Sequence, residues 1–554
     1  MCHTRKMAGH YRDYLAELRQ EFPSPFACDS AGLGGLGLAV AQAFAEFQAP
    51  RSNASLVQAQ ADFDPSSARC LRIADEPQPA SRVARQLIAH VSGMLHPANP
   101  AGATNLAPPP TNSGVLGYLL AALMNPNLAS DEGGAGAAMA EVKAAAMAAA
   151  LVGYDPETSS GLFTFGGSGT ILYGLRMGLE KALPGSMRTG LCQPATIVCS
   201  DRAHHACQTA AAWLGIGTDQ VVRVPTDACR QIRPCLVETE CRDVLRAGLP
   251  LAAIVATLGT TDAFGLDDVT ALFEIRERLV DEFNLDYRPH LHADAVFGWA
   301  FCVFTDYDFE HNPLGFSGAT LRALSQIAAR LQGLGLADSM GLDFHKTGFT
   351  PLPSSLLLTR LATDLTRLSR HRDDIPYLFQ TGEYHPGLFT LETTRGGAGP
   401  LAALANLLRF GKNGWRAILG HLVHVSQILR DRLAQDPAIC LLNSQNAGPV
   451  TLFRVYPAGV PAAATLHKER HDPAFRGQFQ AYSDYNRRIF EAMHRAARQG
   501  GGAAVALTTG SGETDFDEPI CALKAYIMTP FADERHVANL VESIATARKA
   551  VIDA

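Results

Sequence analysis

Between residues 161 and 295, short apolar segments alternate with longer segments of helical pattern. The segment Leu251–Leu258 contains a single polar residue, Thr257, and reads as a strand that is buried on both faces. Such strands are typical of parallel sheets, whose two faces are covered by crossover helices. Further strands are expected at 195–200, 220–224 and 290–295, and helices at 171–183, 204–214, 236–247 and 272–283. The alternation predicts an α/β fold with a mostly parallel central sheet.

Chemically useful side chains stand at the ends of these strands. In open α/β sheets, ligands gather beyond the carboxyl ends of the strands. Five residues lie at or just past such ends: Ser168, His204, Thr261, Asp294 and Lys346. Their shared position predicts one ligand site at this edge of the sheet.

Lys346 follows a short strand in which Leu342 and Phe344 alternate with polar residues. A lysine in that place can be buried, which lowers its pKa and frees the amine for a Schiff base with a carbonyl cofactor. Pyridoxal phosphate (PLP) is the usual cofactor of this kind, and it needs a carboxylate at its pyridine nitrogen. Asp294, in His292-Ala-Asp294, can supply the carboxylate. The alternative for Lys346 is an ordinary solvated loop lysine.

A glycine turn precedes the first helix of the alternation. Residues 161–170 read as a short strand that ends in Gly166-Gly-Ser168 and continues into a helix. This geometry points backbone N–H groups at an anion. The turn lacks the Walker pattern and Gly-x-Gly-x-x-Gly, so alone it is a weak indication of a phosphate site.

Composition limits which binding partners and which cellular compartment are expected. A net charge of −7 argues against nucleic acid or an anionic membrane as the main partner. The twelve cysteines include no Cys-x-x-Cys pair, which favours free thiols in a reducing cytoplasm and gives no zinc signature, so no metal is expected. The alanine-rich segment 135–152 is interrupted by Glu141 and Lys143, which predicts a buried helix and no membrane span.

The chain divides into three expected parts. Residues 1–114 form an N-terminal helical segment, with helices expected at 11–22, 38–47 and 83–94. Residues 115–400 form the large domain, and 401–554 a smaller α+β domain with helices at 399–408 and 415–433. Five prolines between residues 96 and 112 exclude regular helix there, and an ordered coil lining a site is preferred over a linker.

Five ordered motifs resemble the group II PLP-dependent amino-acid decarboxylases, the family of glutamate, aromatic-amino-acid and 2,4-diaminobutyrate decarboxylases. The motifs are Gly166-Gly-Ser168, Ser200-Asp-Arg-Ala-His204, Ala256-Thr-Leu-Gly-Thr-Thr261 with Asp267, His292-Ala-Asp294, and His345-Lys346. The resemblance implies the aspartate-aminotransferase-like fold type I, PLP and a homodimer.

The same resemblance implies a role for each motif residue. Lys346 would hold PLP and Asp294 would keep its pyridine nitrogen protonated. His204 would stack on the ring. The remaining expected cofactor contacts are Gly167 and Ser168 at the phosphate, and Thr261 and His345 as hydrogen-bonding groups.

The chain departs from the family pattern at three places. Ile171 stands where many members have asparagine, and Val296 where a small residue is usual. Asp294 and Lys346 are further apart than in shorter members, because of extra residues within 304–336. This segment is either an insertion at the mouth of the site or a surface elaboration.

Two further residues carry roles that the resemblance implies. Residues 376–386 are similar to the mobile catalytic loop of the family, in which Tyr384, or alternatively His385, would protonate the substrate carbon. Arg395 would bind the substrate carboxylate, since arginine binds carboxylates in a bidentate way. The alternatives are a surface loop and a structural salt bridge.

The predicted function is decarboxylation of an L-amino acid to the amine. The run Tyr377-Leu-Phe-Gln380 is similar to the glutamate branch, which favours a small acidic or diamino acid as substrate. One alternative is an aldehyde-forming oxidative decarboxylase or a carbon–carbon lyase with the same cofactor. Another is a non-catalytic binding protein on the same fold.

Overall fold

The computed structural model describes residues 64–91, 94–95, 97–375, 378 and 380–552. The chain forms two compact units, one made of residues 1–96 with 494–502 and one of 97–493 with 503–554. In the first unit the described helices are α3 (Pro65–Ala68) and α4 (Ala80–His90), and the latter overlaps the helix expected at 83–94. The helices expected at 11–22 and 38–47 lie outside the described residues. The three-part division of the chain, with its boundaries at 114 and 400, stays a prediction.

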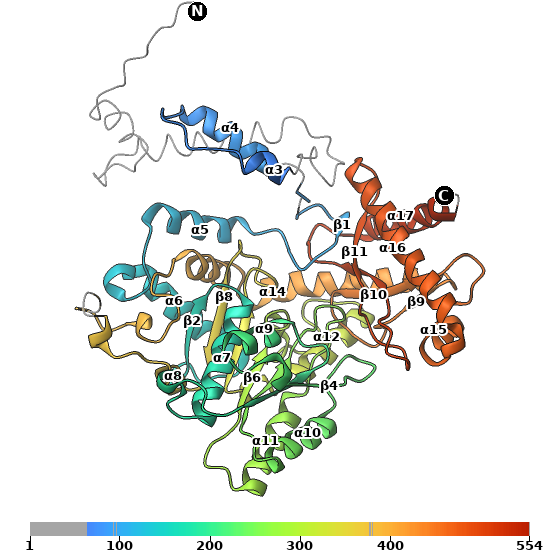
Figure 1. Ribbon diagram of the computed structural model, residues 1–554. Helices are drawn as coiled ribbons and strands as arrows, with labels where there is room; N and C mark the ends of the chain where they lie inside the picture. The colour runs from blue at the N-terminus through green and yellow to red at the C-terminus, as the bar shows by residue number, and fades with distance from the viewer. Residues whose placement is uncertain (1–63, 92–93, 96, 376–377, 379, 553–554) are drawn as a thin grey trace, which may run out of the picture. The chain divides into compact units, whose positions relative to one another are not determined.

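A seven-stranded sheet forms the centre of the second unit (Figure 1). Its strand order is β2-β8-β7-β6-β5-β3-β4. The strands are β2 (Ser160–Thr164), β3 (Thr196–Ser200), β4 (Val221–Val224), β5 (Leu251–Thr257), β6 (His290–Asp294), β7 (Ser339–Asp343) and β8 (Ser355–Thr359). Neighbours from β7 to β4 pair in parallel, while β8 runs antiparallel to both β7 and β2. The mostly parallel sheet is confirmed, and the carboxyl ends of all strands except β8 share one edge.

Helices follow the strands as the hydrophobic pattern predicts. Asp268 caps one of them, since its side chain accepts a hydrogen bond from the Ala271 N–H, and Leu272, Ile275 and Leu279 then face the core. The helices of this layer are α7 (Gly167–Ala182), α8 (Ser186–Thr189), α9 (Ala206–Trp213), α10 (Pro234–Arg246), α11 (Val269–Phe283) and α12 (Gly318–Leu331). Each crossover helix therefore returns the chain to the same end of the sheet.

A second, five-stranded sheet has the order β1-β11-β12-β10-β9. Its strands are β1 (Gly102–Ala103), β9 (Ile439–Leu441), β10 (Val450–Val455), β11 (Ala504–Thr508) and β12 (Ala522–Tyr526). The accompanying helices are α15 (Ala462–His471), α16 (Arg476–Arg498) and α17 (Glu534–Ile552). The sequence pattern predicts strands at 449–455 and 523–528 and a final helix at 537–550, and β10, β12 and α17 confirm them.

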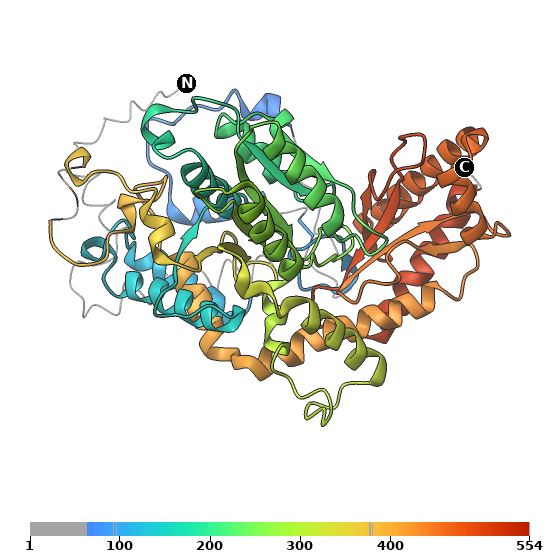
Figure 2. The same cartoon turned by 90° about the horizontal axis from the view of Figure 1, so that it is seen from below.

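Helix α14 (Ala398–Leu433) runs from the large sheet towards the second sheet (Figure 2). The helices expected at 399–408 and 415–433 are confirmed as the two helical parts of this element, on either side of a kink. The chain passes through a single kink at Gly411, whose φ of 55° is open to glycine, and the helix continues on the other side. The polar run between the two apolar stretches is therefore a bend inside one helix.

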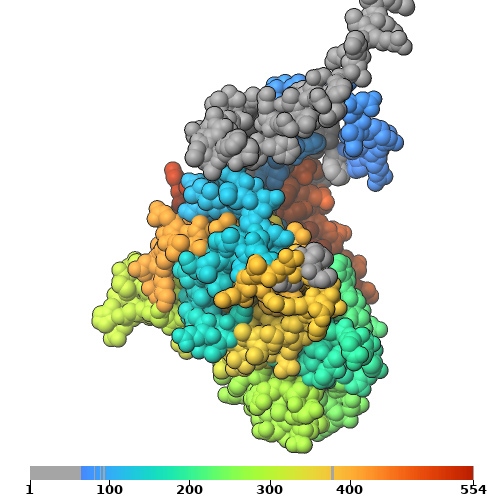
Figure 3. Space-filling view, turned by 90° about the vertical axis from the view of Figure 1, so that its left-hand side faces the viewer, coloured from blue at the N-terminus to red at the C-terminus, as the bar shows by residue number. Residues whose placement is uncertain are grey.

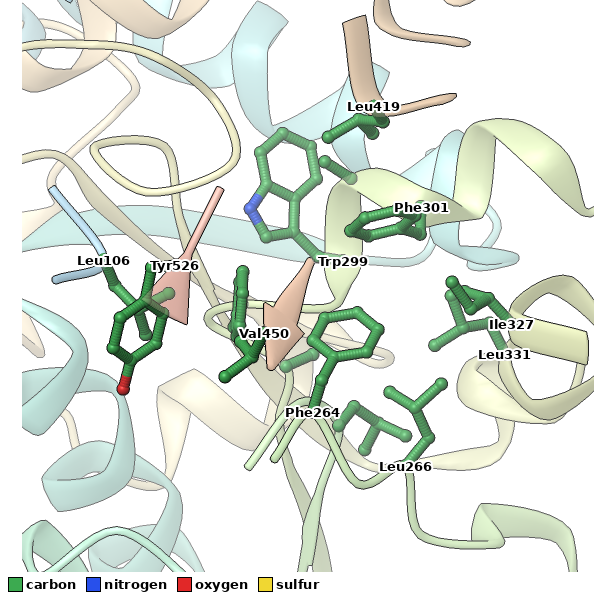
Figure 4. Packing of buried hydrophobic residues seen from close by; sticks show 14 of the residues in the cluster. Leu106, Phe264, Leu266, Trp299, Phe301, Ile327, Leu331, Leu419, Val450 and Tyr526 are labelled. Carbon is green, nitrogen blue, oxygen red and sulfur yellow. The ribbon is translucent and has the colours of Figure 1, made fainter. Parts of the chain in front are cut away.

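The two sheets share one hydrophobic core (Figure 4). Phe264 and Trp299 come from loops that follow strands of the large sheet, and Val450 and Tyr526 come from the second sheet. Burying a side chain of this size contributes about 1.5–3 kcal/mol. Tyr526 also donates a hydrogen bond to the carbonyl oxygen of Thr261 at 2.8 Å. The second sheet thus supports a loop that carries a predicted site residue.

The segment 304–336 holds α12, which confirms the helix that the sequence pattern predicts near 319–331. α12 packs against α14 and against the short helix η3 (Trp299–Phe304). Ile327 and Leu331 join the shared core (Figure 4). Whether the segment also borders the mouth of the site stays a prediction.

Helix α6 (Asp131–Val152) is the single helix among the described residues whose length and mean hydropathy of 1.5 meet the requirements of a membrane span. One of its faces is buried inside the protein and carries the charged residue Glu141, which is fully buried. A helix that buries a paired charge in this way fits the expected core helix.

All ten described cysteines are free, and five of them are buried. No cluster of metal-ligating side chains occurs within the described ranges.

Candidate active site

The predicted site residues stand where parallel strands end side by side. Strand β6 ends at Asp294, and β7 ends at Asp343, three residues before Lys346. The strands pair in parallel, with Asp294 opposite Gly341. Both carboxyl ends lie at the same edge of the sheet, and the positive charge of Lys346 is close enough to act on the pKa of Asp294. The topology therefore brings the predicted lysine and carboxylate into one site.

Asp343 contacts three neighbouring polar side chains. Its Oδ2 atom lies 2.9 Å from Lys346 Nζ and 3.4 Å from His345 Nε2, and its Oδ1 accepts a hydrogen bond from the Ser355 hydroxyl. The Asp343 side chain is 2% exposed, whereas that of Lys346 is 20% exposed. Asp343 thus holds the amine of Lys346 at the site without sealing it from a ligand.

His345 is turned towards the backbone of the next strand. Its Nδ1 atom lies 3.1 Å from the carbonyl oxygen of Ser354. Burial lowers the pKa of His345, with the Asp343 charge opposing this effect. The structure therefore places His345 beside Lys346, and its contact with a cofactor stays a prediction.

The turn that carries Lys346 is fixed on several sides. The Thr347 hydroxyl donates to the Phe297 carbonyl at 3.0 Å, and the Trp415 indole N–H donates to the Thr347 carbonyl at 3.0 Å. The side-chain amide of Asn406 donates to the carbonyl of Gly348 at 2.8 Å.

The proline-rich coil also reaches this turn. Its Thr111 N–H donates to the Phe349 carbonyl at 2.9 Å, and the Thr111 hydroxyl donates to Asn406 at 2.6 Å. Thr111 also caps helix α5 (Asn112–Met124). The preferred interpretation of an ordered coil is thus confirmed for the described residues 97–111, which end beside the lysine turn.

Asp294 is a buried carboxylate with an unused acceptor. The residue is 4% exposed, and its Oδ1 has no hydrogen-bond partner in the part of the chain that the structure describes. Burial raises the pKa of Asp294 to about 6, while the Lys346 charge opposes the rise. A buried acceptor without a partner costs free energy. The site is therefore suited to a ligand that brings a cationic N–H donor to this atom.

Helix α7 points its N-terminus at the same site. Gly167 opens the helix, and the N–H groups of its first turn have no helical acceptor. A Cβ atom at Gly167 would lie 3.0 Å from Asp343 Oδ2 and 3.1 Å from Val296. Glycine thus lets the helix end approach the Asp343 carboxylate closely. Ser168 follows in an exposed position, where its side chain is open to a ligand.

His204 and Thr261 line a cavity of about 430 Å³ at the ends of β3 and β5. Burial, together with His205 and Lys346, lowers the pKa of His204 to about 4. Its Nδ1 accepts a hydrogen bond from the Ala206 N–H at 3.2 Å. His204 is therefore a neutral ring at neutral pH. Thr261 is exposed at the cavity wall.

Tyr384 and Arg395 meet at a different carboxylate, Glu141 of α6. The Tyr384 hydroxyl donates to Glu141 Oε2 at 3.1 Å, and the Arg395 guanidinium forms two contacts with the same carboxylate. Arg395 also donates to the carbonyls of Leu128 and Phe163, at 3.0 and 2.8 Å, and is 4% exposed. In this structure Arg395 is thus a buried structural partner, and its predicted substrate contact requires that arrangement to open.

The chain around Tyr384 lies on the surface over the start of α6 (Figure 3). Asp131 accepts hydrogen bonds from the N–H groups of Glu383 and Tyr384, at 2.9 and 3.3 Å. His385 is buried, with Nδ1 4.0 Å from Asp131 Oδ1. Residues 376, 377 and 379 lie outside the described residues, and with them much of the run 377–380. The role of Tyr384 or His385 as proton donor stays a prediction.

Sequence reasoning did not single out three side chains that contact predicted site residues or line the cavity beside His204. Asp343 stands in the motif Asp343-Phe-His-Lys346, at the last position of a strand, and that position was the available signal. Glu141 was treated as an interruption of an apolar helix, although a single carboxylate on a buried face itself indicates a partner. Arg230 lines the cavity beside His204 from a distant turn, and no sequence pattern marks it.

A family model described as "Pyridoxal-dependent decarboxylase conserved domain" matches residues 114–455. The chain belongs to this family. An aspartate 1-decarboxylase of Aliivibrio fischeri is 22% identical over 361 residues, which are 63% of this chain and 57% of that protein. An L-2,4-diaminobutyrate decarboxylase of Acinetobacter baumannii is 25% identical over 327 residues, 56% of this chain and 58% of that protein. The matched part is thus somewhat over half the length of these curated relatives.

Solved structures show the same fold over nearly the whole chain. The structure described as Oryza sativa TDC with PLP and tryptamine has a TM-score of 0.76 and 18% identity, and it covers 95% of this chain and 99% of that one. At this identity the likeness shows the fold, which is the fold type I of PLP-dependent decarboxylases. The expected fold class is confirmed.

The residues of this pyridoxal-dependent decarboxylase family member fit its cofactor. The unpaired, buried oxygen of Asp294 is suited to the protonated pyridine nitrogen of PLP. The N-terminus of α7 at Gly167 is suited to the phosphate. Lys346 supplies an amine that is held at 2.9 Å from Asp343 and is still partly exposed. These three groups therefore match the pyridine nitrogen, the phosphate and the carbonyl of PLP, respectively.

Proposed function

We propose that this protein catalyses the PLP-dependent decarboxylation of an L-amino acid to the amine and CO2. The observation that carries the proposal is that Asp294 and Lys346 lie at or just past the ends of two adjacent strands. An unpaired buried carboxylate beside an accessible amine costs stability unless a ligand uses both. When PLP is bound, its ring accepts the electron pair left by the departing CO2.

The side chains around the pair have distinct tasks. Asp294 holds a proton at the pyridine nitrogen, and its buried position strengthens this charge-assisted contact. Neutral His204 offers a flat ring that covers the ligand without adding positive charge. Asp343 orients the amine of Lys346. These tasks require a dry and rigid site, and the fixed turn from 346 to 349 provides rigidity.

The substrate is a small acidic or diamino acid. The two curated relatives named above act on aspartate and on L-2,4-diaminobutyrate, respectively, which support both classes. The cavity of about 430 Å³ beside His204 is large enough for a short side chain. The cavity volume does not distinguish the two substrate classes, so the charge of the residues that line the cavity has to select between them.

Other outcomes on the same cofactor remain alternatives with less support. An aldehyde-forming reaction would follow if no group returned a proton to the substrate carbon. Tyr384 is an available donor, provided that it leaves Glu141. A carbon–carbon lyase has no separate support. A non-catalytic binding protein would have no use for the costly arrangement of Asp294 and Lys346.

The test measures CO2 and amine from the PLP-loaded full chain with L-aspartate, L-glutamate and L-2,4-diaminobutyrate in turn. We expect equal amounts of CO2 and amine with at least one of them, and none from Lys346→Ala loaded in the same way. Failure of all these amino acids, and of a wider amino-acid panel, in a protein that binds PLP would overturn decarboxylation.

The remaining expectations on assembly and location are also proposals. We propose a homodimer, because α5 exposes apolar residues that a subunit contact would cover: Leu116, Leu119, Leu120 and Met124. Sedimentation of the full chain measures this directly, since the single chain has a mass of 59.2 kDa. A cytoplasmic location, and the absence of membrane and nucleic-acid partners, stay predictions.

A further inference from the structure

The cavity beside His204 is rich in arginine. Its lining residues come from the ends of β3 and β5, from the turn before α10 and from the loop between β11 and β12. Three of them are arginines, namely Arg202, Arg223 and Arg230, and two are aspartates, Asp201 and Asp262. The cavity wall thus carries more cations than anions.

Both aspartates already have cationic partners. Asp201 Oδ2 lies 3.4 Å from Arg202 Nη2. Asp262 Oδ1 lies 2.6 Å from Lys524 Nζ, and its Oδ2 accepts a hydrogen bond from the Thr508 hydroxyl at 2.9 Å. Both carboxylates raise the pKa of Arg230 through their charge, but neither forms an ion pair with its guanidinium.

The Arg230 guanidinium has no ion pair and no hydrogen bond to any described residue. Burial lowers the pKa of Arg230 to about 10, and the charges of Arg202 and Arg470 add to the effect. At that pKa the side chain remains a cation at neutral pH. A half-buried cation without a partner is costly, and an anion that entered the cavity would relieve the cost.

The chain holds Arg230 in this place by its backbone. Arg230 has a φ of 60°, in the left-handed region that side chains rarely adopt. A Cβ atom at Gly265 would lie only 2.1 Å from the Arg230 carbonyl oxygen, so only glycine permits this contact.

Neighbouring contacts fix the same turn. The side-chain amide of Asn446 donates to the Cys229 carbonyl at 2.7 Å, and Asp267 accepts a hydrogen bond from the Ile232 N–H at 2.6 Å. Asp267 also accepts from the Thr257 N–H at the end of β5, at 2.7 Å. The arginine is therefore pre-positioned relative to the strand ends that carry the site.

We propose that Arg230, assisted by Arg202, binds the side-chain carboxylate of the substrate and selects acidic over diamino acids. The inference rests on the proposed decarboxylase function and narrows its substrate class. Arginine binds a carboxylate through paired N–H donors, whereas the ammonium group of a diamino acid would be repelled by the unpaired Arg230 guanidinium. His204 lines the same cavity, so a bound side chain would start next to the predicted cofactor site.

The first test is a binding measurement on the PLP-loaded full chain by calorimetry. The probes are succinate and glutarate as dicarboxylates, butyrate as a monocarboxylate and putrescine as a diamine. We expect a dicarboxylate to bind about tenfold or more tightly than butyrate and putrescine, because charge-assisted hydrogen bonds are the strong ones. Arg230→Met should weaken dicarboxylate binding about tenfold or more and leave butyrate unchanged.

Two further variants control the test. Arg223→Met removes an exposed arginine of the same cavity, and we expect it to change dicarboxylate binding less than about threefold, because exposed charges are screened. Arg230→Lys keeps the charge and should restore part of the affinity. Thermal unfolding of each variant shows whether the fold is retained. Equal losses in both methionine variants, or equal Arg230-dependent binding of butyrate and succinate, would overturn the assignment.

Turnover separates the inference from the proposed function. We expect kcat/KM for L-aspartate or L-glutamate to exceed that for L-2,4-diaminobutyrate, and Arg230→Met to reduce the difference. Faster decarboxylation of the diamino acid would overturn the acidic specificity and leave decarboxylation intact. Arg230-dependent dicarboxylate binding without CO2 from any amino acid would support the anion site and overturn decarboxylation.

Discussion

At the scale of single residues, Asp294 links cofactor binding to stability. Its pKa is raised from 3.8 to about 6 by burial, so the folded apo-protein disfavours its charged form. The folded state then binds more protons than the unfolded state between these two pH values. The stability that Asp294 contributes is therefore highest below pH 3.8 and is lost as the pH rises through 6.

We predict that Asp294→Asn stabilises the apo-protein at pH 7 by up to about 3 kcal/mol, since each pKa unit corresponds to ~1.4 kcal/mol. At pH 4.5 the gain should fall to roughly 1 kcal/mol, because the wild-type carboxyl is then mostly protonated when folded. Urea unfolding of both apo-proteins at the two pH values measures the difference. A gain that does not depend on pH would show that the Asp294 charge is not the cause.

Arg395 also bears on stability at this scale, because it is the ion-pair partner of the fully buried Glu141. Removing one partner of a buried ion pair typically costs about 3–5 kcal/mol. We predict a loss of this size in Arg395→Met by urea unfolding. The double variant Arg395→Met with Glu141→Met should recover part of it, since no unpaired charge stays buried. Unchanged stability in Arg395→Met, with a raised KM, would instead favour the predicted substrate contact.

At the scale of elements, the chain from Glu383 to His385 is held at the start of α6 by hydrogen bonds from the Glu383 and Tyr384 N–H groups to Asp131. Its Tyr384 hydroxyl is bound to Glu141, and burial raises its pKa, so it holds its proton firmly. We predict that Tyr384→Phe loses most amine production and releases more aldehyde per CO2 in the presence of oxygen. Product analysis with a substrate of the wild-type enzyme measures this ratio. Amine formation at the wild-type rate would exclude Tyr384 as the proton donor and leave His385 as the remaining candidate in this chain.

Elements differ in how well the sequence predicts them. The strands β3 and β5 could be predicted because their apolar runs are nearly continuous and short. The two helical parts of α14 could be predicted as well, and the polar stretch around Gly411 marks the kink between them. The docking of Tyr384 and Arg395 on Glu141 depends on packing between segments about 240 residues apart, which a local pattern does not contain.

At the scale of the whole molecule, topology explains what could be foreseen of the site. Lys346, Asp294, His204, Thr261 and Ser168 could be placed together because parallel strands bring their carboxyl ends to one edge. Arg230 could not, because it belongs to a turn whose position is fixed by Gly265 and Asn446 from other parts of the fold. The shared core of the two sheets sets that position (Figure 4).

The central claim is that PLP binds through Lys346, and peptide mass analysis tests it most directly. The full chain is incubated with PLP, reduced with borohydride to fix the lysine–carbonyl bond, and digested. We predict a pyridoxyl group on the peptide that contains Lys346. No label on the corresponding peptide is expected in Lys346→Ala. Labelling of another lysine at the same level in both proteins, with Lys346 unmodified, would contradict the account.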